Sequence, residues 1–171
     1  MNSFLKGRGR LNILGFIISG MLGVLLHFLN DLINVPVVFK FLAATDESVF
    51  EHLKLYFFPV MAVTLGQYFI ERGSEKNGLE LIQQIGNRSI ATLIVTAVQI
   101  IFFYGYTVFI PPNPVIDIAG YFVFLAAIFF ISNMLNDGMQ KKTGTAAFVL
   151  LLLFLIIFTY YKPDLPLFSA P

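Results

Sequence analysis

The chain has 171 residues, of which 57% are hydrophobic and only 12% are charged, and its mean hydropathy is +0.81. Soluble domains average about 45–50% apolar and about 25% charged residues, so this composition excludes a soluble domain and indicates a membrane protein. The net charge of +1 argues against a nucleic-acid-binding surface, and the lack of cysteine excludes disulfides and Cys-based metal sites.

Five apolar segments have the length of about 20 residues that a membrane-spanning helix requires. Their predicted limits are residues 11–30, 47–70, 89–110, 115–135 and 145–161. We therefore predict an all-α fold, with a single transmembrane domain over residues 1–171 that forms a bundle of about five transmembrane helices. The first segment is too long for the core of a signal peptide and no small-x-small cleavage site follows it, so we interpret it as a retained helix.

Small residues recur every four positions along the first span, at Gly15, Ser19 and Gly23. Small residues at this spacing allow a second helix to approach closely. We therefore predict helix packing along this stripe. The same register continues into His27 and Asp31, so a polar site is expected at the end of the same helix face.

Residues 31–45 are moderately apolar and too short to cross a membrane, so we expect a short interfacial or re-entrant segment there. The second span follows, and its purely apolar part, residues 55–70, covers only roughly 24 Å at 1.5 Å per residue. That is shorter than the hydrocarbon core of about 30 Å. The charged start of this span must therefore lie at or near the membrane interface.

Ionisable side chains cluster at that charged start, and they form the candidate functional site. On an ideal helix Glu47, Glu51 and Lys54 share one face, and His52 lies on a neighbouring face. The end of the first span and the start of the second lie on the same side of the membrane, so the two groups can converge. The candidate ligand-binding or proton-handling residues are Glu47, Glu51, His52, His27, Asp31 and Lys54.

Three interpretations of this cluster remain open. Imidazole and carboxylate groups suit a divalent metal such as zinc or manganese, with His27, Asp31, Glu51 and His52 as candidate ligands. Carboxylate–histidine clusters also relay protons or bind coupling cations, and Lys54 would then keep a glutamate ionised.

The third interpretation is structural. Asp46 and Glu47 then only stabilise the N-terminal dipole of the second span, with Thr45 as its N-cap. Glu51 and Lys54 then form an ordinary ion pair between residues three apart on a helix.

Lysine and arginine are distributed unevenly between the two sides of the predicted spans. One side holds Lys6, Arg8, Arg10, Arg72, Lys76, Arg88, Lys141 and Lys142, and the other holds Lys40, Lys54 and Lys162. Because cytoplasmic loops carry an excess of positive charge, we predict that the N-terminus is inside and the C-terminus outside. The candidate site then lies at the outer face.

Three functions fit these features. The leading prediction is a multi-pass protein that binds or permeates a cation, proton or small polar ligand at its outer face. A membrane-embedded, metal-dependent hydrolase acting on a lipid or lipid-linked substrate is the first alternative. A non-catalytic subunit or assembly factor that docks through the Gly15–Gly23 stripe is the second. Five spans are few for a transporter built from repeats, so a homo-oligomer or a membrane partner subunit is expected.

The stretch Asp46-Glu47-Ser48-Val49-Phe50-Glu51-His52-Leu53-Lys54, with Pro59 downstream, resembles a known sequence signature. The signature, Asn-Glu-Ser-x-Trp-Glu-His-x-Lys, belongs to a small, uncharacterised bacterial integral-membrane family. Two further segments are similar, Leu26-His27-Phe28 and the tail at residues 163–168, whereas Asp46 and Phe50 depart from the signature. The resemblance implies a multi-pass fold, a bacterial cytoplasmic membrane and a suspect motif, and it implies no chemistry.

Overall fold

The computed structural model describes the backbone of residues 2–71, 78–135 and 141–171 and the side chains of residues 11–70, 80–135 and 142–171. The elements are α1 (Asn2–Ile33), η1 (Val37–Phe39), α2 (Val49–Glu71), α3 (Gly78–Thr107), α4 (Pro114–Met134), α5 (Lys141–Tyr160) and η2 (Pro166–Phe168). Within these ranges there is no strand, and five helices are long and apolar enough to cross a membrane. The predicted all-α fold with five spans is confirmed.

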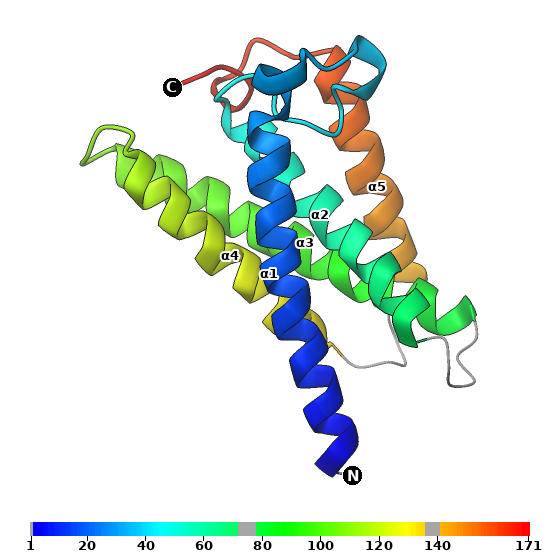
Figure 1. The fold of residues 1–171 in the computed structure, drawn as a ribbon. Helices are drawn as coiled ribbons and strands as arrows, with labels where there is room; N and C mark the ends of the chain where they lie inside the picture. The colour runs from blue at the N-terminus through cyan, green and yellow to red at the C-terminus, as the bar shows by residue number, and fades with distance from the viewer. Residues whose placement is uncertain (1, 72–77, 136–140) are drawn as a thin grey trace.

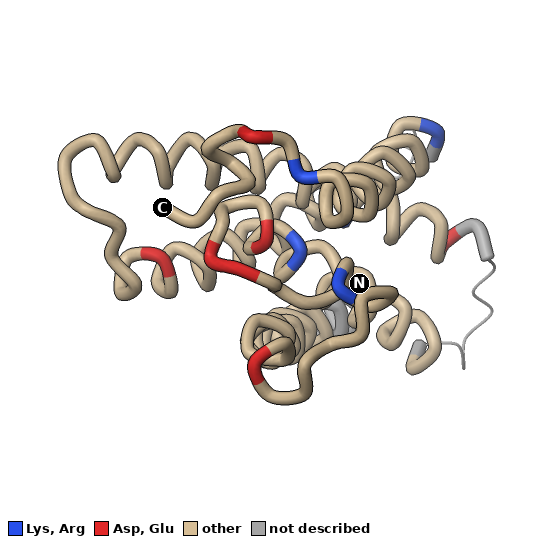
Figure 2. The backbone as a smooth tube through the Cα atoms, turned by 90° about the horizontal axis from the view of Figure 1, so that it is seen from above, with Lys and Arg blue, Asp and Glu red and all other residues tan. Residues whose placement is uncertain are grey.

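The helices run between two ends of the molecule (Figure 1). One end, here called the loop end, carries residues 34–48 and the C-terminal tail. The opposite end carries the N-terminus and is called the N-terminal end. Figure 2, which looks onto the loop end, shows long uncharged stretches of chain between a few charged residues. This distribution is the one that spans surrounded by lipid require.

Helix α2 is the central helix of the bundle. In its apolar part 61% of the residues are buried, against 22% in each of the other four spans. Its side chains Tyr56, Phe57 and Val60 form the core together with Leu125 and Ile128 of α4. Because α2 is surrounded mostly by protein, its first turns can hold charged groups that lipid would not tolerate.

The stripe of small residues on α1 lies inside the bundle. Gly15, Ser19 and Gly23 are buried, and α1 packs there against α2 and α4. A Cβ atom on Gly15 would lie 2.6 Å from Nε2 of Gln67, and one on Gly23 would clash with the Tyr121 hydroxyl. The close approach predicted for this stripe is therefore made within the chain. A partner that docks on the protein needs another surface.

Two further glycines bring α3 and α5 together. A Cβ on Gly144 of α5 would lie 2.5 Å from Cα of Gly86, and one on Gly86 would lie 3.0 Å from Cα of Gly144. Only residues without a side chain allow the two backbones to approach so closely.

The turn between α3 and α4 is held by side chains at both of its ends. Asn113 is the N-cap of α4, and its side chain accepts a hydrogen bond from the N–H of Val115 at 2.9 Å, with Pro114 in the first turn. The Tyr106 hydroxyl donates to Oδ1 of Asp117 at 2.6 Å. This turn forms part of the wall of the pocket described below.

Two predicted helix starts are corrected by the structure. Helix α3 begins at Gly78 rather than at residue 89. The hydropathy signal missed this start because the first turns of α3 carry polar residues that line a polar pocket. Helix α2 begins at Val49 rather than at Glu47. Its N-cap is Ser48, whose hydroxyl accepts from the N–H of Glu51 at 3.4 Å, and not Thr45.

Candidate metal centre

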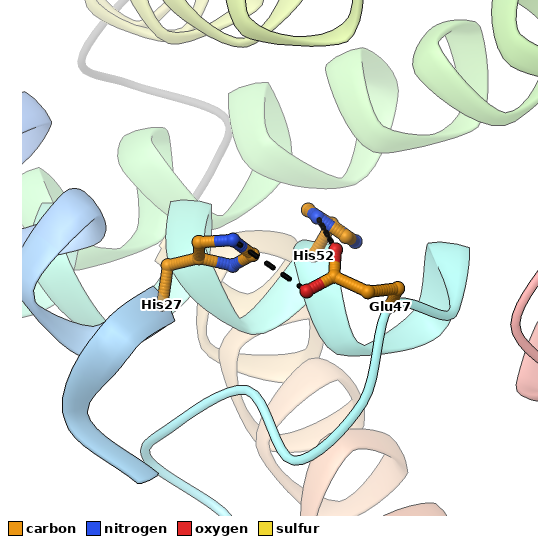
Figure 3. Close-up of side chains that lie close together, drawn as sticks. All are labelled: His27, Glu47 and His52. Carbon is orange, nitrogen blue, oxygen red and sulfur yellow. Dashed lines mark ion pairs between the residues drawn. The ribbon is translucent and has the colours of Figure 1, made fainter. Parts of the chain in front are cut away.

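Three side chains from separate parts of the chain meet at the loop end. His27 comes from α1, Glu47 from the segment before α2, and His52 from α2, as Figure 3 shows. Nε2 of His27 lies 3.7 Å from Oε1 of Glu47, and Nε2 of His52 lies 3.6 Å from Oε2. The two imidazole rings are 5.3 Å apart between centroids. We refer to these three residues as the imidazole–carboxylate group.

The loop after α1 positions Glu47. The N–H of Ala44 donates to the carbonyl of Leu26 at 3.3 Å, which returns the chain to the side of α1. The N–H of Ser48 then donates to Oδ1 of Asp46 at 2.9 Å, a local turn that leads into α2. Glu47 lies within this turn, between the end of one helix and the start of the next.

A backbone contact fixes the tautomer of His52. Its Nδ1 lies 2.8 Å from the carbonyl oxygen of Ser48. A carbonyl only accepts, so Nδ1 donates to it and Nε2 is left facing Glu47. Imidazoles that bind metals are commonly oriented in this way, with the second ring nitrogen bonded to a carbonyl.

The donor atoms of the three residues lie close enough together to be candidate ligands of one metal ion. One ligand atom from each of His27, Glu47 and His52 lies within 4.8 Å of the other two. In a tetrahedral zinc site with bonds of about 2.0–2.1 Å, ligand atoms lie roughly 3.3 Å apart. The separations of 3.6 and 3.7 Å involve different oxygens of Glu47. With one ligand atom from each residue the three mutual separations are all within 4.8 Å, so the side chains would have to draw closer together around a zinc ion. Two histidines and one carboxylate also suit Fe²⁺ or Mn²⁺.

A pocket of about 530 Å³ adjoins the imidazole–carboxylate group, whose three residues form part of its wall. The pocket lies between α1, α2, α3 and α4. Its polar lining residues include Gln99 and Asp117, and its phenylalanine and tyrosine lining residues are Phe28, Tyr56, Phe102, Phe103, Tyr121, Phe122 and Phe124. The site thus combines ligating side chains with a mostly apolar cavity, which is the usual composition of a small-molecule site.

A second charged cluster lies nearby and is fully paired. Nζ of Lys54 lies 2.5 Å from Oε2 of Glu51, and both side chains are completely buried. Nζ of Lys162, from the C-terminal tail, lies 2.8 Å from Oε1 of Glu51 and 2.5 Å from Oδ2 of Asp46. These four residues are called the buried ion network after the buried pair Glu51–Lys54, although Lys162 is only partly buried and Asp46 is exposed. Two carboxylates and two ammonium groups make its net charge zero.

The buried ion network also binds the backbone of the loop. Lys54 donates to the carbonyl of Lys40 at 2.9 Å and to the hydroxyl of Thr159 at 3.5 Å. The N–H of Thr45 donates to Glu51 at 2.8 Å. The network therefore connects the loop, α2, α5 and the tail, so its role is to stabilise the fold at this end.

The two members of the network that lie outside the spans have shifted pKa values. Burial alone would raise the pKa of Asp46, but hydrogen bonds from Lys162 and Ser48 outweigh it and hold the pKa below its ordinary value. Burial alone would lower the pKa of Lys162, but its contacts with Asp46 and Glu51 outweigh it and raise the pKa. Both groups are therefore charged near neutral pH.

The structure divides the predicted site into two parts. His27 and His52 come together as predicted for a metal, but the carboxylate between them belongs to Glu47. Glu51 and Lys54 belong to the buried ion network, and their predicted ion pair is present. Asp31 is exposed and lies outside the imidazole–carboxylate group.

The reason for this division is geometric. Successive residues on a helix are rotated by about 100°, so Glu51 and His52 point in different directions. Glu47 precedes α2 and does not follow the helical register. The contribution of Lys162 was not predicted. The signal for it was a single lysine just after the last span, in a chain with few charges.

The five spans define an integral membrane protein, and its loop end holds a histidine–glutamate group suited to a metal. Over residues 5–170 the chain matches a family described as "Family of unknown function (DUF6512)", and it belongs to that family. No protein of curated function and no solved structure matches the chain. The family assignment carries no activity, so a functional argument must come from the site itself.

Proposed function

We propose that this protein binds a divalent transition-metal ion, zinc in the first instance, through His27, Glu47 and His52. The observation that supports the proposal is the convergence of three ligand atoms within 4.8 Å from three separate segments. The orientation of His52 by the Ser48 carbonyl adds to it, because it leaves Nε2 free to bind. Two imidazoles and a carboxylate leave one tetrahedral position open for a ligand.

The open position would face the adjoining pocket. A polar group bound to the metal would then extend an apolar body among the aromatic side chains that line the 530 Å³ cavity. A lipid or lipid-linked molecule has this division into a polar and an apolar part. The pocket therefore favours a second, narrower candidate function, metal-assisted hydrolysis of such a substrate, in which the ion acts as a Lewis acid.

Elemental analysis of the purified full-length protein tests metal binding. After loading with zinc and removal of unbound ion, the wild-type protein is expected to retain about one zinc per chain. His27→Ala and His52→Ala each remove a ligand and are expected to lose most of it. Asp31→Asn is the matched control, because Asp31 lies on α1 one turn beyond His27 but outside the group. Equal zinc in all four proteins would overturn the proposal.

Transport and hydrolysis predict different results once metal binding is established. A permeation route through this site predicts a cation flux in proteoliposomes that disappears in Glu47→Gln. Hydrolysis predicts no flux, but zinc-dependent turnover of a lipid-linked ester that His27→Ala abolishes. If zinc is bound and neither activity is found, the non-catalytic subunit remains, and cross-linking in membranes then tests for the predicted homo-oligomer or partner.

The orientation of the protein determines which side of the membrane the site serves. The excess of lysine and arginine at the N-terminal end supports an inside N-terminus and an outer site. Because the chain has no cysteine, a single Ser169→Cys substitution in the exposed tail provides a unique label. Labelling of whole cells by a membrane-impermeant thiol reagent would support this orientation. Labelling only after lysis would indicate the opposite orientation.

A further inference from the structure

A second pocket, of about 280 Å³, lies toward the N-terminal end and is mainly polar in its lining. It is lined by residues that include Asn12, Gln67, Asn87, Arg88, Ser132 and Asn133. From Asn12 to His27 the axis of α1 extends roughly 22 Å at 1.5 Å per residue, so this pocket is separate from the imidazole–carboxylate group. We refer to it as the arginine pocket.

Arg88 of α3 is the central cation of this pocket. Its side chain is buried, with the residue only 6% exposed. Nη2 donates to Oδ1 of Asn12 at 2.7 Å, and the guanidinium carbon lies 3.9 Å from the centroid of the Phe129 ring. Nη1 is buried and has no hydrogen-bond partner among the described residues. Both partners of the guanidinium are therefore neutral, and one of its donor groups is unused.

The described lining of the pocket does not supply a counter-charge for Arg88. Its single described acid is Glu80, which lies about two turns earlier on α3, roughly 12 Å along the helix axis. Neutral amides surround the guanidinium instead. A buried charge without an opposite charge is costly, and it is normally retained where a charged partner binds.

We propose that the arginine pocket binds a phosphate group, held by the planar fork of the Arg88 guanidinium. A guanidinium matches two phosphate oxygens with two parallel N–H donors, and a bound phosphate would use the unpaired Nη1. Side-chain amides of Asn133 and Gln84 in the lining offer further donors.

The location of the pocket also favours phosphate. The span in α3 begins at Glu80, so Arg88 lies within its first three turns, near the level at which lipid headgroups meet the hydrocarbon core. The phosphate can therefore come from the headgroup of a phospholipid or from a free ion in the aqueous phase. The two sources have the same chemistry at the guanidinium and are separated by experiment.

The test uses the full-length protein purified in a mild detergent. In one arm, native mass spectrometry measures how much phosphatidylglycerol and phosphatidylcholine remain bound after exchange into defined mixed micelles. In the other arm, calorimetry follows titration with inorganic phosphate. Retention of about one phospholipid per chain indicates a headgroup, and saturable binding of inorganic phosphate without retained lipid indicates a free anion. Binding in neither arm overturns the proposal.

Variants locate the binding at Arg88. Arg88→Met is expected to weaken binding at least about tenfold, because a hydrogen-bonded charge is removed. Lys142→Met is the matched control, since Lys142 is an exposed cation at the start of α5, at the same end of the molecule. Equal losses in these two variants would mean that general surface charge attracts the anion, and the proposal would fail.

A third variant covers the case in which Arg88→Met does not fold. Arg88→Lys keeps the positive charge but has no planar fork. It is expected to fold, as judged by its helical circular dichroism, and to bind phosphate about tenfold more weakly than the wild type. If Arg88→Lys bound phosphate with wild-type affinity, the proposal that the guanidinium fork holds the phosphate would be overturned.

Discussion

Replacement of Lys54 by methionine tests whether the buried ion network stabilises the fold. Met keeps most of the apolar length of the lysine side chain and removes its charge. In the wild type Nζ of Lys54 lies 2.5 Å from a carboxylate oxygen of Glu51, with both side chains completely buried. After the substitution the Glu51 carboxylate stays buried and keeps only Lys162 and the N–H of Thr45 as partners.

The expected loss follows from the cost of removing one partner from a buried pair, which is about 3–5 kcal/mol. Because Lys162 still neutralises Glu51, we expect a value at the lower end, about 3 kcal/mol. Glu51→Gln is expected to cost more than Lys54→Met. It leaves the buried Lys54 ammonium without its carboxylate partner, so that only neutral acceptors remain: the Lys40 carbonyl, the Thr159 hydroxyl and the new amide oxygen. The double variant removes both buried charges, so its loss is expected to be smaller than the sum of the two single losses.

Unfolding by sodium dodecyl sulfate in mixed micelles, followed by far-ultraviolet circular dichroism, measures these free energies. Lys142→Met is the control, since loss of an exposed lysine changes stability by less than about 0.5 kcal/mol. If Lys54→Met matched this control, the pair would not stabilise the protein. If the losses of Glu51→Gln and Lys54→Met simply added in the double variant, the two side chains would not be coupled.

Two further predictions concern helix packing and pH. Gly144→Leu is expected to destabilise the protein by about 1–3 kcal/mol because its side chain would meet Gly86, whereas Gly105→Ala meets no atom within 4 Å and should be close to neutral in the same unfolding assay. The contribution of Asp46 is fully present above its ordinary pKa of 3.8 and is lost as the pH falls through its lower folded value. That of Lys162 is fully present below 10.5 and is lost as the pH rises through its higher folded value. Asp46→Asn should therefore make the stability fall less steeply as the pH is lowered. An unchanged fall in stability at acidic pH would contradict the pairing of Asp46 with Lys162.

The number and type of the spans could be predicted from the sequence because lipid restricts the choice to long apolar helices. The exact starts could not, since they depend on what each end faces. The polar residues around Arg88 indicate a loop when hydropathy alone is considered, yet they line a pocket from a helix. Glu47 shows the same limit, because its place depends on a turn formed by Asp46 and Ser48.

The sequence predicted the types of residue in the candidate site, but only some of the residues that form it. The convergence of His27 with the start of the second span follows from topology, since consecutive helix ends lie on one side of the membrane. Which carboxylate joins the histidines depends on the path of the loop, and no periodicity encodes that path. The pairing of Glu51 with Lys162 joins residues far apart in the chain, so only the folded structure brings it to notice.

X-ray absorption spectroscopy at the zinc edge of the loaded wild-type protein tests the central claim most directly. The account predicts a first shell of nitrogen and oxygen atoms at about 2.0–2.1 Å with the outer-shell scattering of two imidazoles. In His52→Ala the imidazole scattering should fall by about half or the bound zinc should be lost. A spectrum without imidazole scattering, identical in the two proteins, would contradict a metal centre at His27, Glu47 and His52.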